Sequence, residues 1–231
     1  MLIAVEGIDG AGKTSLIRDL ARHLVAGGAP VTCVRRYLLQ EVTALWWRLI
    51  EADDLDQRGS AHLAAADYRV GVERVIRPAI SGGSVVFADK YYYSHLVYFA
   101  LRGIDLDALR SYFGDPLVPD LVLHVRVPVE TALARLVDRK GKPDLLECGL
   151  DYRVGLSIGA AFARWGLGGA PLDLRLAHFR QHQDAASTLL PSLLPEGVTV
   201  TLDATADPAD VLAAALAAMS DAAAATGLSR S

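Results

Sequence analysis

Short apolar runs alternate with longer segments of helical periodicity along this chain. The runs are continuous rather than alternating with polar residues, which is typical of strands buried on both faces of a parallel sheet. Five such runs are candidate strands: Leu2–Val5, Val31–Val34, Val85–Ala88, Leu121–Val127 and Val198–Leu202. The pattern therefore predicts an α/β fold, with a five-stranded parallel sheet covered by helices on both faces.

Helical patterns fill the intervals between these runs. The expected helices are Ser15–Ala26, Val42–Ala52, Ala61–Ser81, Ser94–Leu101, Leu106–Phe113, Val129–Val137 and Pro208–Ala224. Residues 138–183 contain no clear strand, and long segments of this kind are often lids or binding loops. We expect one domain over residues 1–225, with a lid or insert at about 138–183 and a disordered tail at 226–231.

Composition and charge narrow the class of protein. The chain has 231 residues, of which 52% are hydrophobic, and a net charge of −4. This balance fits a globular domain and gives no indication of a nucleic-acid binder, so an anionic substrate needs a local basic cluster. The two cysteines suit a reducing cytoplasm. We see no charged leader and no stretch approaching the ~20 apolar residues of a membrane span, so we expect a cytoplasmic protein without a membrane role.

The segment Gly7–Thr14 reads G-I-D-G-A-G-K-T and fits the phosphate-binding pattern G-x-x-x-x-G-K-[ST] between a strand and a helix. In such a loop, backbone N–H groups and the helix start surround phosphate oxygens. Lys13 is expected to reach the β- and γ-phosphates, and the Thr14 hydroxyl to ligate Mg²⁺. The alternative is a glycine-rich turn that binds nothing. The predicted ATP-binding residues are Gly7, Asp9, Gly10, Ala11, Gly12, Lys13, Thr14 and Ser15.

Other polar residues follow the predicted strands and so point to the same crevice. Asp89 ends the third strand and is a candidate second metal ligand, although it could instead cap a helix or stabilise a turn. Asp9 either faces an acceptor substrate or stabilises the loop. Two basic groups, Arg35–Arg36 and Arg139–Lys142, are candidates to bind phosphate. The aromatic residues from Tyr91 to Phe99 either stack on a ring or pack in the core.

Several segments together resemble the thymidylate kinases, a family of nucleoside monophosphate kinases. No single segment beyond the phosphate loop is decisive, but their order and spacing are specific. The segments are Glu6–Thr14, Ala65–Ile80, Asp89–Tyr98, Leu101–Leu106, Pro119–Val125, Val127–Leu136 and Val198–Ala204.

The resemblance implies a P-loop NTPase fold, a three-layer α/β/α sandwich with a lid insertion. It implies ATP and Mg²⁺ as cofactors, phosphoryl transfer to a small nucleotide-like acceptor, and a homodimer. Asp9 would contact the acceptor, and Lys90 would face its phosphate at a position where the family usually has Arg. Because Gly10 and Ala11 leave no arginine in the loop, Arg139 would supply the catalytic charge. Arg36 lies near a family arginine that binds the acceptor phosphate. The predicted catalytic residues are Lys13, Arg139, Asp9 and Lys90.

The chain departs from the family where the base is read. At the position of the family's stacking Phe this chain has Ala64, at that of its base-reading Arg it has Tyr68, and at that of its Gln it has Phe99. The stretch from about 152 to 178 is also longer than the family's lid region. A site without these groups no longer rejects analogues, so we expect an acceptor other than, or besides, thymidylate. A kinase of a non-nucleotide metabolite and a non-catalytic nucleotide-binding protein are the alternatives. The predicted acceptor-binding residues are Asp9, Arg36, Ala64, Tyr68, Arg69, Lys90, Tyr98 and Phe99.

Overall fold

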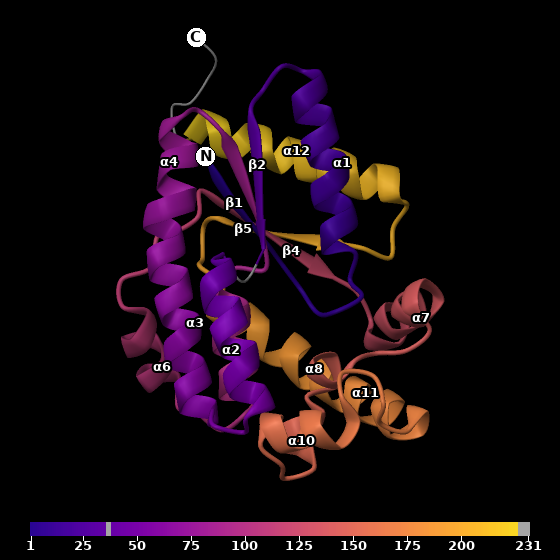
Figure 1. The fold of residues 1–231 in the computed structure, drawn as a ribbon. Helices are drawn as coiled ribbons and strands as arrows, with labels where there is room; N and C mark the ends of the chain where they lie inside the picture. Colours follow the sequence, from indigo (N-terminus) through magenta and orange to yellow (C-terminus); the bar gives the residue numbers. More distant parts are fainter. Residues whose placement is uncertain (36–37, 226–231) are drawn as a thin grey trace.

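A five-stranded, all-parallel sheet forms the centre of the computed structural model, which describes residues 1–35 and 38–225 (Figure 1). The strand order is β2-β3-β1-β4-β5, so the central strand β1 lies between β3 and β4. This arrangement confirms the predicted α/β class and the three-layer fold of the P-loop NTPases. The strands are β1 Leu2–Glu6, β2 Val31–Arg35, β3 Val85–Asp89, β4 Leu121–Arg126 and β5 Thr199–Asp203.

Helices cover both faces of the sheet. On one face α1 and α12 pack together, and the helices from α3 to α5 lie on the other (Figure 1). The predicted helix Ala61–Ser81 is interrupted by one π-helical turn, η1. The helical elements are α1 Lys13–Ala26, α2 Gln40–Glu51, α3 Gln57–Gly71, η1 Val72–Ile76, α4 Arg77–Ser81, α5 Tyr92–Ala100, α6 Leu106–Phe113, α7 Val129–Lys140, α8 Leu145–Cys148, α9 Leu150–Arg153, α10 Ile158–Trp165, α11 Leu172–Leu189, η2 Leu190–Leu193 and α12 Pro208–Ala225.

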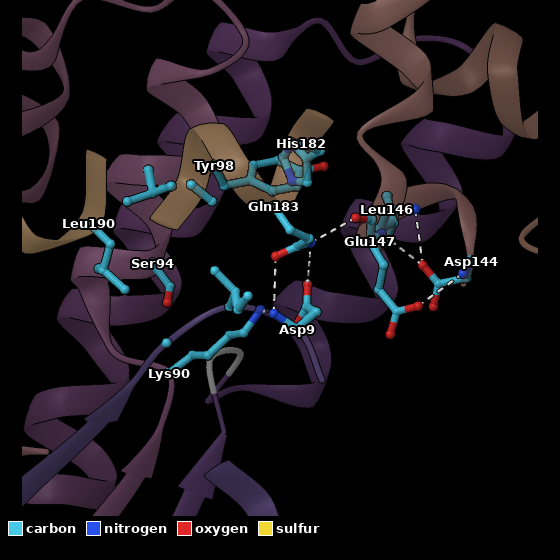
Figure 2. A pocket seen from close by; sticks show the side chains of 14 residues that line it. Asp9, Lys90, Ser94, Tyr98, Asp144, Leu146, Glu147, His182, Gln183 and Leu190 are labelled. Carbon is cyan, nitrogen blue, oxygen red and sulfur yellow. Dashed lines mark hydrogen bonds and ion pairs between the residues drawn. The ribbon is translucent and has the colours of Figure 1, made fainter. Parts of the chain in front are cut away.

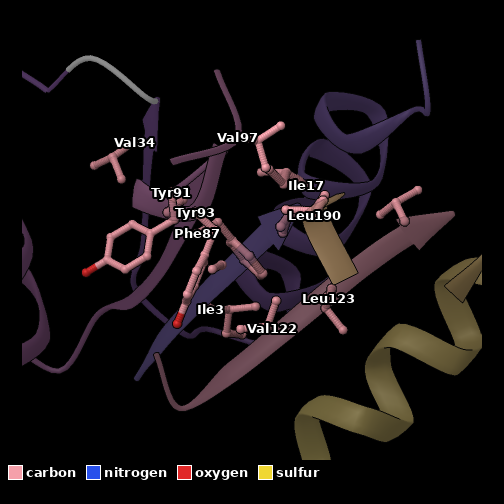
Figure 3. Packing of buried hydrophobic residues seen from close by; sticks show 14 of the residues in the cluster. Ile3, Ile17, Val34, Phe87, Tyr91, Tyr93, Val97, Val122, Leu123 and Leu190 are labelled. Atoms are coloured by element: carbon pink, nitrogen blue, oxygen red, sulfur yellow. The ribbon is translucent and has the colours of Figure 1, made fainter. Parts of the chain in front are cut away.

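The main core lies between the sheet and its two helical layers. Ile3, Phe87 and Leu123 come from three adjacent strands and are fully buried (Figure 3). The cluster extends to Tyr91 and Tyr93, at the loop after β3 and the start of α5. The carboxyl edge of the sheet is therefore rigidly supported, which matters because ligands bind at this edge in open α/β sheets.

Residues 138–183, the predicted lid or insert, are mostly helical. The helices α8 to α10 and most of α11 fall in this segment, which contains no strand. Local signals fix their starts, because the Asp144 side chain caps α8 in a capping box with Glu147, and Ser157 caps α10. A second buried cluster, including Trp46, Leu136 and Phe179, joins these helices to α2 and α7.

The alanine-rich helix α12 differs from the expectation that no segment approaches the length and hydropathy of a membrane span. By length and mean hydropathy (1.2) alone it is apolar enough to cross a membrane. Such a helix is weak evidence of a membrane span, and Ala215, Ala218 and Met219 are buried against the main core. The helix contacts α1, β4 and β5.

Candidate active site

The loop after β1 has a backbone that only glycine accommodates. Gly7, Gly10 and Gly12 have φ values of 147°, 86° and 101°. A Cβ atom on Gly7 would lie 2.4 Å from the carbonyl oxygen of Val125, and one on Gly10 would lie 2.2 Å from that of Ala132. Positive φ and the close approach of β4 and α7 therefore both require glycine here. The result is a loop whose N–H groups can face an anion at the start of α1.

Lys13 begins α1 and is held inside this loop. It is only 6% exposed, and its Nζ donates a hydrogen bond to the Ile8 carbonyl oxygen at 2.7 Å. Burial, and next the positive charge of Lys90, lower the pKa of Lys13 to about 8. Since a nearby anion favours the charged form of a lysine, a bound phosphate would compensate for the cost of burying this group.

Thr14 and Asp89 meet at the mouth of the loop. The Thr14 hydroxyl donates to the Asp89 carboxylate at 2.5 Å, linking the start of α1 to the end of β3. Both groups offer hard oxygen atoms, and Mg²⁺ is usually held by one or two such groups together with phosphate and water. The pair fits Mg²⁺ in this respect. Within residues 1–35 and 38–225, no group of three or more His, Cys, Asp or Glu could hold a metal by itself.

A cleft of about 590 Å³ opens in front of the loop and brings together most of the predicted phosphate-binding groups. Arg35 reaches it from the end of β2, and Arg139 from the last turn of α7. Four basic side chains thus converge on one cavity of a protein whose net charge is −4. Its lining residues are Asp9, Gly10, Gly12, Lys13, Thr14, Ser15, Arg35, Thr43, Asp89, Lys90, Arg139 and Glu147.

Asp9 and Lys90 form an ion pair beside this cleft, with 2.6 Å between Oδ1 and Nζ. Lys90 has a φ of 64°, which is unfavourable for a residue with a side chain. Gln183 of α11 completes the arrangement, because it accepts from the Asp9 N–H at 3.0 Å and donates to Asp9 Oδ2 at 3.2 Å (Figure 2). The sequence pattern gave no reason to choose Gln183, which lies 174 positions from Asp9.

Glu6, another residue not predicted for the site, holds the segment that follows Lys90 through hydrogen bonds to Tyr91 and Ser94. Its carboxylate is fully buried and accepts from the Tyr91 N–H at 2.8 Å and the Ser94 hydroxyl at 2.5 Å. Burial raises the pKa of Glu6, and these hydrogen bonds oppose that shift. Glu6 therefore fixes the turn between β3 and α5 that carries Lys90.

The positions assigned to base recognition do not face the cleft. Ala64, Tyr68 and Phe99 are 3%, 4% and 1% exposed and belong to the main core. The Tyr68 hydroxyl lies 2.8 Å from that of Tyr91, inside a group of aromatic rings. Arg69 is exposed on α3 and lines neither cavity beside the loop. The predicted role of Arg36 falls outside the described residues.

Tyr98 lines a second, smaller cavity of about 190 Å³ on the far side of Asp9 and Lys90. The cavity lies between α5 and α11 (Figure 2). It is lined by Gly7, Ile8, Asp9, Lys90, Ser94, Val97, Tyr98, Asp144, Leu146, Glu147, His182, Gln183, Ala186 and Leu190.

Arg135, which the sequence did not single out, lies on the opposite side of the glycine loop. Its guanidinium donates to the carbonyl oxygens of Ala11 at 3.4 Å and Ala204 at 2.7 Å. It lines a mostly apolar cavity of about 250 Å³ formed with the start of α1 and the segment after β5. This cavity, next to the loop, could hold the ring system of a nucleotide whose phosphates lie in the loop.

Comparison with known proteins gives one consistent result. The model of the thymidylate kinase family matches residues 5–147. A thymidylate kinase of Xanthomonas campestris pv. campestris (strain B100) is 37% identical over 158 residues, covering 64% of this chain and 65% of that protein. A probable thymidylate kinase of Thermococcus kodakarensis is 32% identical over 153 residues, covering 62% of this chain and 75% of that protein. The chain therefore spans slightly less than two thirds of the length of the Xanthomonas relative.

Proposed function

Because the chain belongs to the thymidylate kinase family, we propose that it transfers the γ-phosphoryl group of ATP to a nucleoside monophosphate, and that thymidylate is a poor acceptor. The main support is the convergence of Lys13, Arg35, Lys90 and Arg139 on one cleft in front of a phosphate-binding loop. Phosphoryl transfer needs this concentration of positive charge, because charge spreads over the equatorial oxygens in the transition state.

ATP binds with its triphosphate in the loop Gly7–Thr14 and its base in the cavity beside Arg135. Backbone N–H groups and the start of α1 bind the phosphate oxygens, and Lys13 contacts the β- and γ-phosphates. A planar guanidinium such as that of Arg135 can pack against an aromatic ring. The two carbonyl oxygens that Arg135 contacts hold it in place.

Thr14 and Asp89 hold the magnesium ion of the ATP complex. Bound there, Mg²⁺ supplies positive charge that neutralises the phosphate oxygens. Asp89 has a carboxylate beside the Thr14 hydroxyl at the rim of the cleft. The two side chains therefore do not have to move far to share one ion.

The acceptor enters from the side of Asp9 and Lys90. Its phosphate replaces the Asp9 carboxylate at Lys90, and Asp9 then contacts the acceptor. An oxygen of the acceptor phosphate forms a bond to the γ-phosphorus while the bond to the β-phosphate oxygen breaks, and ADP leaves. A phosphate monoester is mostly ionised at neutral pH, so no general base is needed. Arg139 neutralises the charge that develops on the transferring group.

The proposal that thymidylate is a poor acceptor rests on Ala64, Tyr68 and Phe99. These residues replace the stacking and hydrogen-bonding groups expected in the family, and all are buried in the core. We also propose, from the family resemblance, that the protein acts in the cytoplasm as a homodimer. Sedimentation velocity would test the dimer.

Measuring ADP release with a panel of nucleoside monophosphates tests the proposed reaction. We expect release with at least one monophosphate, slower turnover of dTMP, and no release by Lys13→Ala when circular dichroism shows a folded chain. Rapid turnover of dTMP with a micromolar KM would contradict the altered specificity. Release with other phosphorylated metabolites but with no nucleotide would instead support the alternative of a metabolite kinase.

A further inference from the structure

Gln183 on α11 forms hydrogen bonds to both the phosphate loop and α8. Its Oε1 accepts from the Asp9 N–H at 3.0 Å, and its Nε2 donates to Asp9 Oδ2 at 3.2 Å and to the Glu147 carbonyl oxygen at 2.7 Å (Figure 2). Gln183 is only 2% exposed. A buried amide needs partners for its polar atoms, and here the oxygen and both amide hydrogens have one.

These partners fix the direction in which the amide points. If its oxygen and nitrogen were exchanged, the NH₂ group would face the Asp9 N–H, and the amide oxygen would face the Asp9 carboxylate and the Glu147 carbonyl oxygen. Each of these contacts would be repulsive, so the amide is stable in one orientation. In that orientation Gln183 holds the backbone and the carboxylate of Asp9 in a fixed relation to each other.

The proposed reaction removes another partner of Asp9. Asp9 Oδ1 lies 2.6 Å from Lys90 Nζ, and we have proposed that the acceptor phosphate takes over Lys90. The bond from Gln183 goes to the other oxygen, Oδ2. It can therefore hold the Asp9 carboxylate in place while Lys90 changes partner. An acceptor that contacts Asp9 then meets a group that is already oriented, which lowers the cost of reaching the reactive geometry.

The bond to Glu147 connects Gln183 to the segment that carries Arg139. Glu147 lies in α8, and its Oε2 is 2.6 Å from Nζ of Lys140. Lys140 follows Arg139 at the end of α7. Contacts therefore run from Asp9 through Gln183 and Glu147 to the neighbour of Arg139, so that the acceptor side of the cleft and the proposed catalytic arginine are held together.

The family match assigns no role to Gln183. The matched region is 5–147, and α11 lies beyond it. A purely structural role would need only the bond to Glu147, which joins α11 to α8. The two other bonds both go to Asp9, which lines the phosphate cleft. This choice of partner indicates a role in the reaction.

We propose that Gln183 is a positioning residue that orients the Asp9 carboxylate toward the acceptor and influences phosphoryl transfer through Asp9. This inference rests on the proposed kinase function, and it adds a residue of α11 to the site.

A matched pair of substitutions on α11 tests the role of Gln183. Gln183→Met keeps the length of the side chain and removes all three hydrogen bonds, whereas Gln181→Met makes the same change at an exposed position. With the nucleoside monophosphate that gives the fastest ADP release, Gln183→Met should lower kcat/KM by about 10- to 100-fold, because small displacements of a positioned group are costly. Gln181→Met should keep the wild-type value. The Kd of Mg-ATP should stay at the wild-type value in both variants, since Gln183 does not line the phosphate cleft. Equal acceptor kinetics in the two variants would overturn the proposal.

A double-mutant cycle with Asp9→Ala separates positioning from a general structural role. If Gln183 acts through Asp9, adding Gln183→Met to Asp9→Ala should lower kcat/KM by less than about threefold, because the two effects are not additive. A loss as large as that in the wild-type background would show that Gln183 acts independently of Asp9, and the proposal would be wrong.

Gln183→Glu provides a second variant in case circular dichroism shows that Gln183→Met does not fold. Glutamate keeps the size of the side chain and an oxygen that can accept from the Asp9 N–H, but it has at most one proton to donate, where glutamine has two. It should also lower kcat/KM without changing the Kd of Mg-ATP, and wild-type kinetics would contradict the inference while leaving the kinase function intact. Binding of Mg-ATP by the wild-type chain without turnover of any nucleoside monophosphate would instead contradict the proposed function, and this inference with it.

Discussion

Raising the pH from about 7 to about 9 should weaken Mg-ATP binding, because Lys13 loses its proton over this range. The pKa of Lys13 is lowered to about 8. In the free protein, about nine tenths of Lys13 is charged at pH 7, half at pH 8 and one tenth at pH 9. A bound triphosphate favours the charged form and raises this pKa. Binding must therefore take up protons from solution, and more of them as the pH rises.

The size of the effect follows from the same pKa. If bound ATP keeps Lys13 fully charged, the number of protons taken up rises from about 0.1 at pH 7 to about 0.5 at pH 8 and about 0.9 at pH 9. The Kd should increase about tenfold between pH 7 and pH 9, because only about a tenth of the free protein then has the charged lysine.

Isothermal titration calorimetry in buffers with different ionisation enthalpies measures this proton uptake. The slope of the observed heat against the ionisation enthalpy of the buffer gives the number of protons taken up. Lys13→Arg is the matched control, because arginine keeps its charge throughout this pH range. Any binding that remains in that variant should proceed without proton uptake at this position. A slope of zero at pH 8 in the wild-type protein, or the same slope in Lys13→Arg, would refute this account of Lys13.

Three further predictions concern particular residues. Gly10→Ala places a methyl group 2.2 Å from a backbone carbonyl oxygen of α7 and should abolish Mg-ATP binding in calorimetry. Gly28→Ala is the control, because Gly28 also has a positive φ but an added methyl group there meets no other atom. This variant should bind Mg-ATP normally and lose about 1–2 kcal/mol of stability. Equal binding of Mg-ATP by both variants would contradict the loop geometry. Arg102→Met leaves Asp151 buried without its charged partner and should lower the free energy of unfolding in urea by about 3–5 kcal/mol. Adding Asp151→Leu should recover part of this loss. An unchanged urea midpoint in Arg102→Met would contradict this. Arg139→Ala should lower kcat by about 10²–10³-fold with little change in the Kd of Mg-ATP, because the charge of Arg139 acts mainly in the transition state. An equally large increase in the Kd of Mg-ATP would contradict this, because it would show that Arg139 binds ATP before the reaction.

The sheet and the phosphate loop could be predicted because their signals are local. Strands buried on both faces give continuous apolar runs, and each of the five predicted strands differs from the observed one by at most one residue at either end. The loop Gly7–Thr14 combines a strand, glycines with positive φ and a helix within a few consecutive positions. Chain order alone then brings Asp89 beside Thr14, because parallel strands end at the same edge of the sheet.

Helix α11 could not be predicted because three of its five buried residues are polar. Arg175, His182 and Gln183 are 3%, 5% and 2% exposed, so the apolar periodicity that marks a core-facing helix is weak. Their partners come from distant parts of the chain, including the Pro143 carbonyl oxygen for Arg175 and Asp9 for Gln183. A sequence pattern does not show which distant groups will satisfy a buried polar residue.

The acceptor side was also the least predictable part of the site. The resemblance identifies Ala64, Tyr68 and Phe99 as departures from the family, but it does not show that the main core encloses all three. Arg135 was missed for a related reason. Its two carbonyl partners, Ala11 and Ala204, lie 124 and 69 positions away, so nothing near it in the sequence marks it.

The most direct test of the account is a crystal structure of the protein with Mg²⁺ and a non-hydrolysable ATP analogue. The account predicts that the triphosphate lies within Gly7–Thr14, that Lys13 contacts the β- and γ-phosphates, and that the metal ion lies between Thr14 and Asp89. A nucleotide bound elsewhere, with Lys13 still hydrogen-bonded to Ile8 and Thr14 to Asp89, would contradict it.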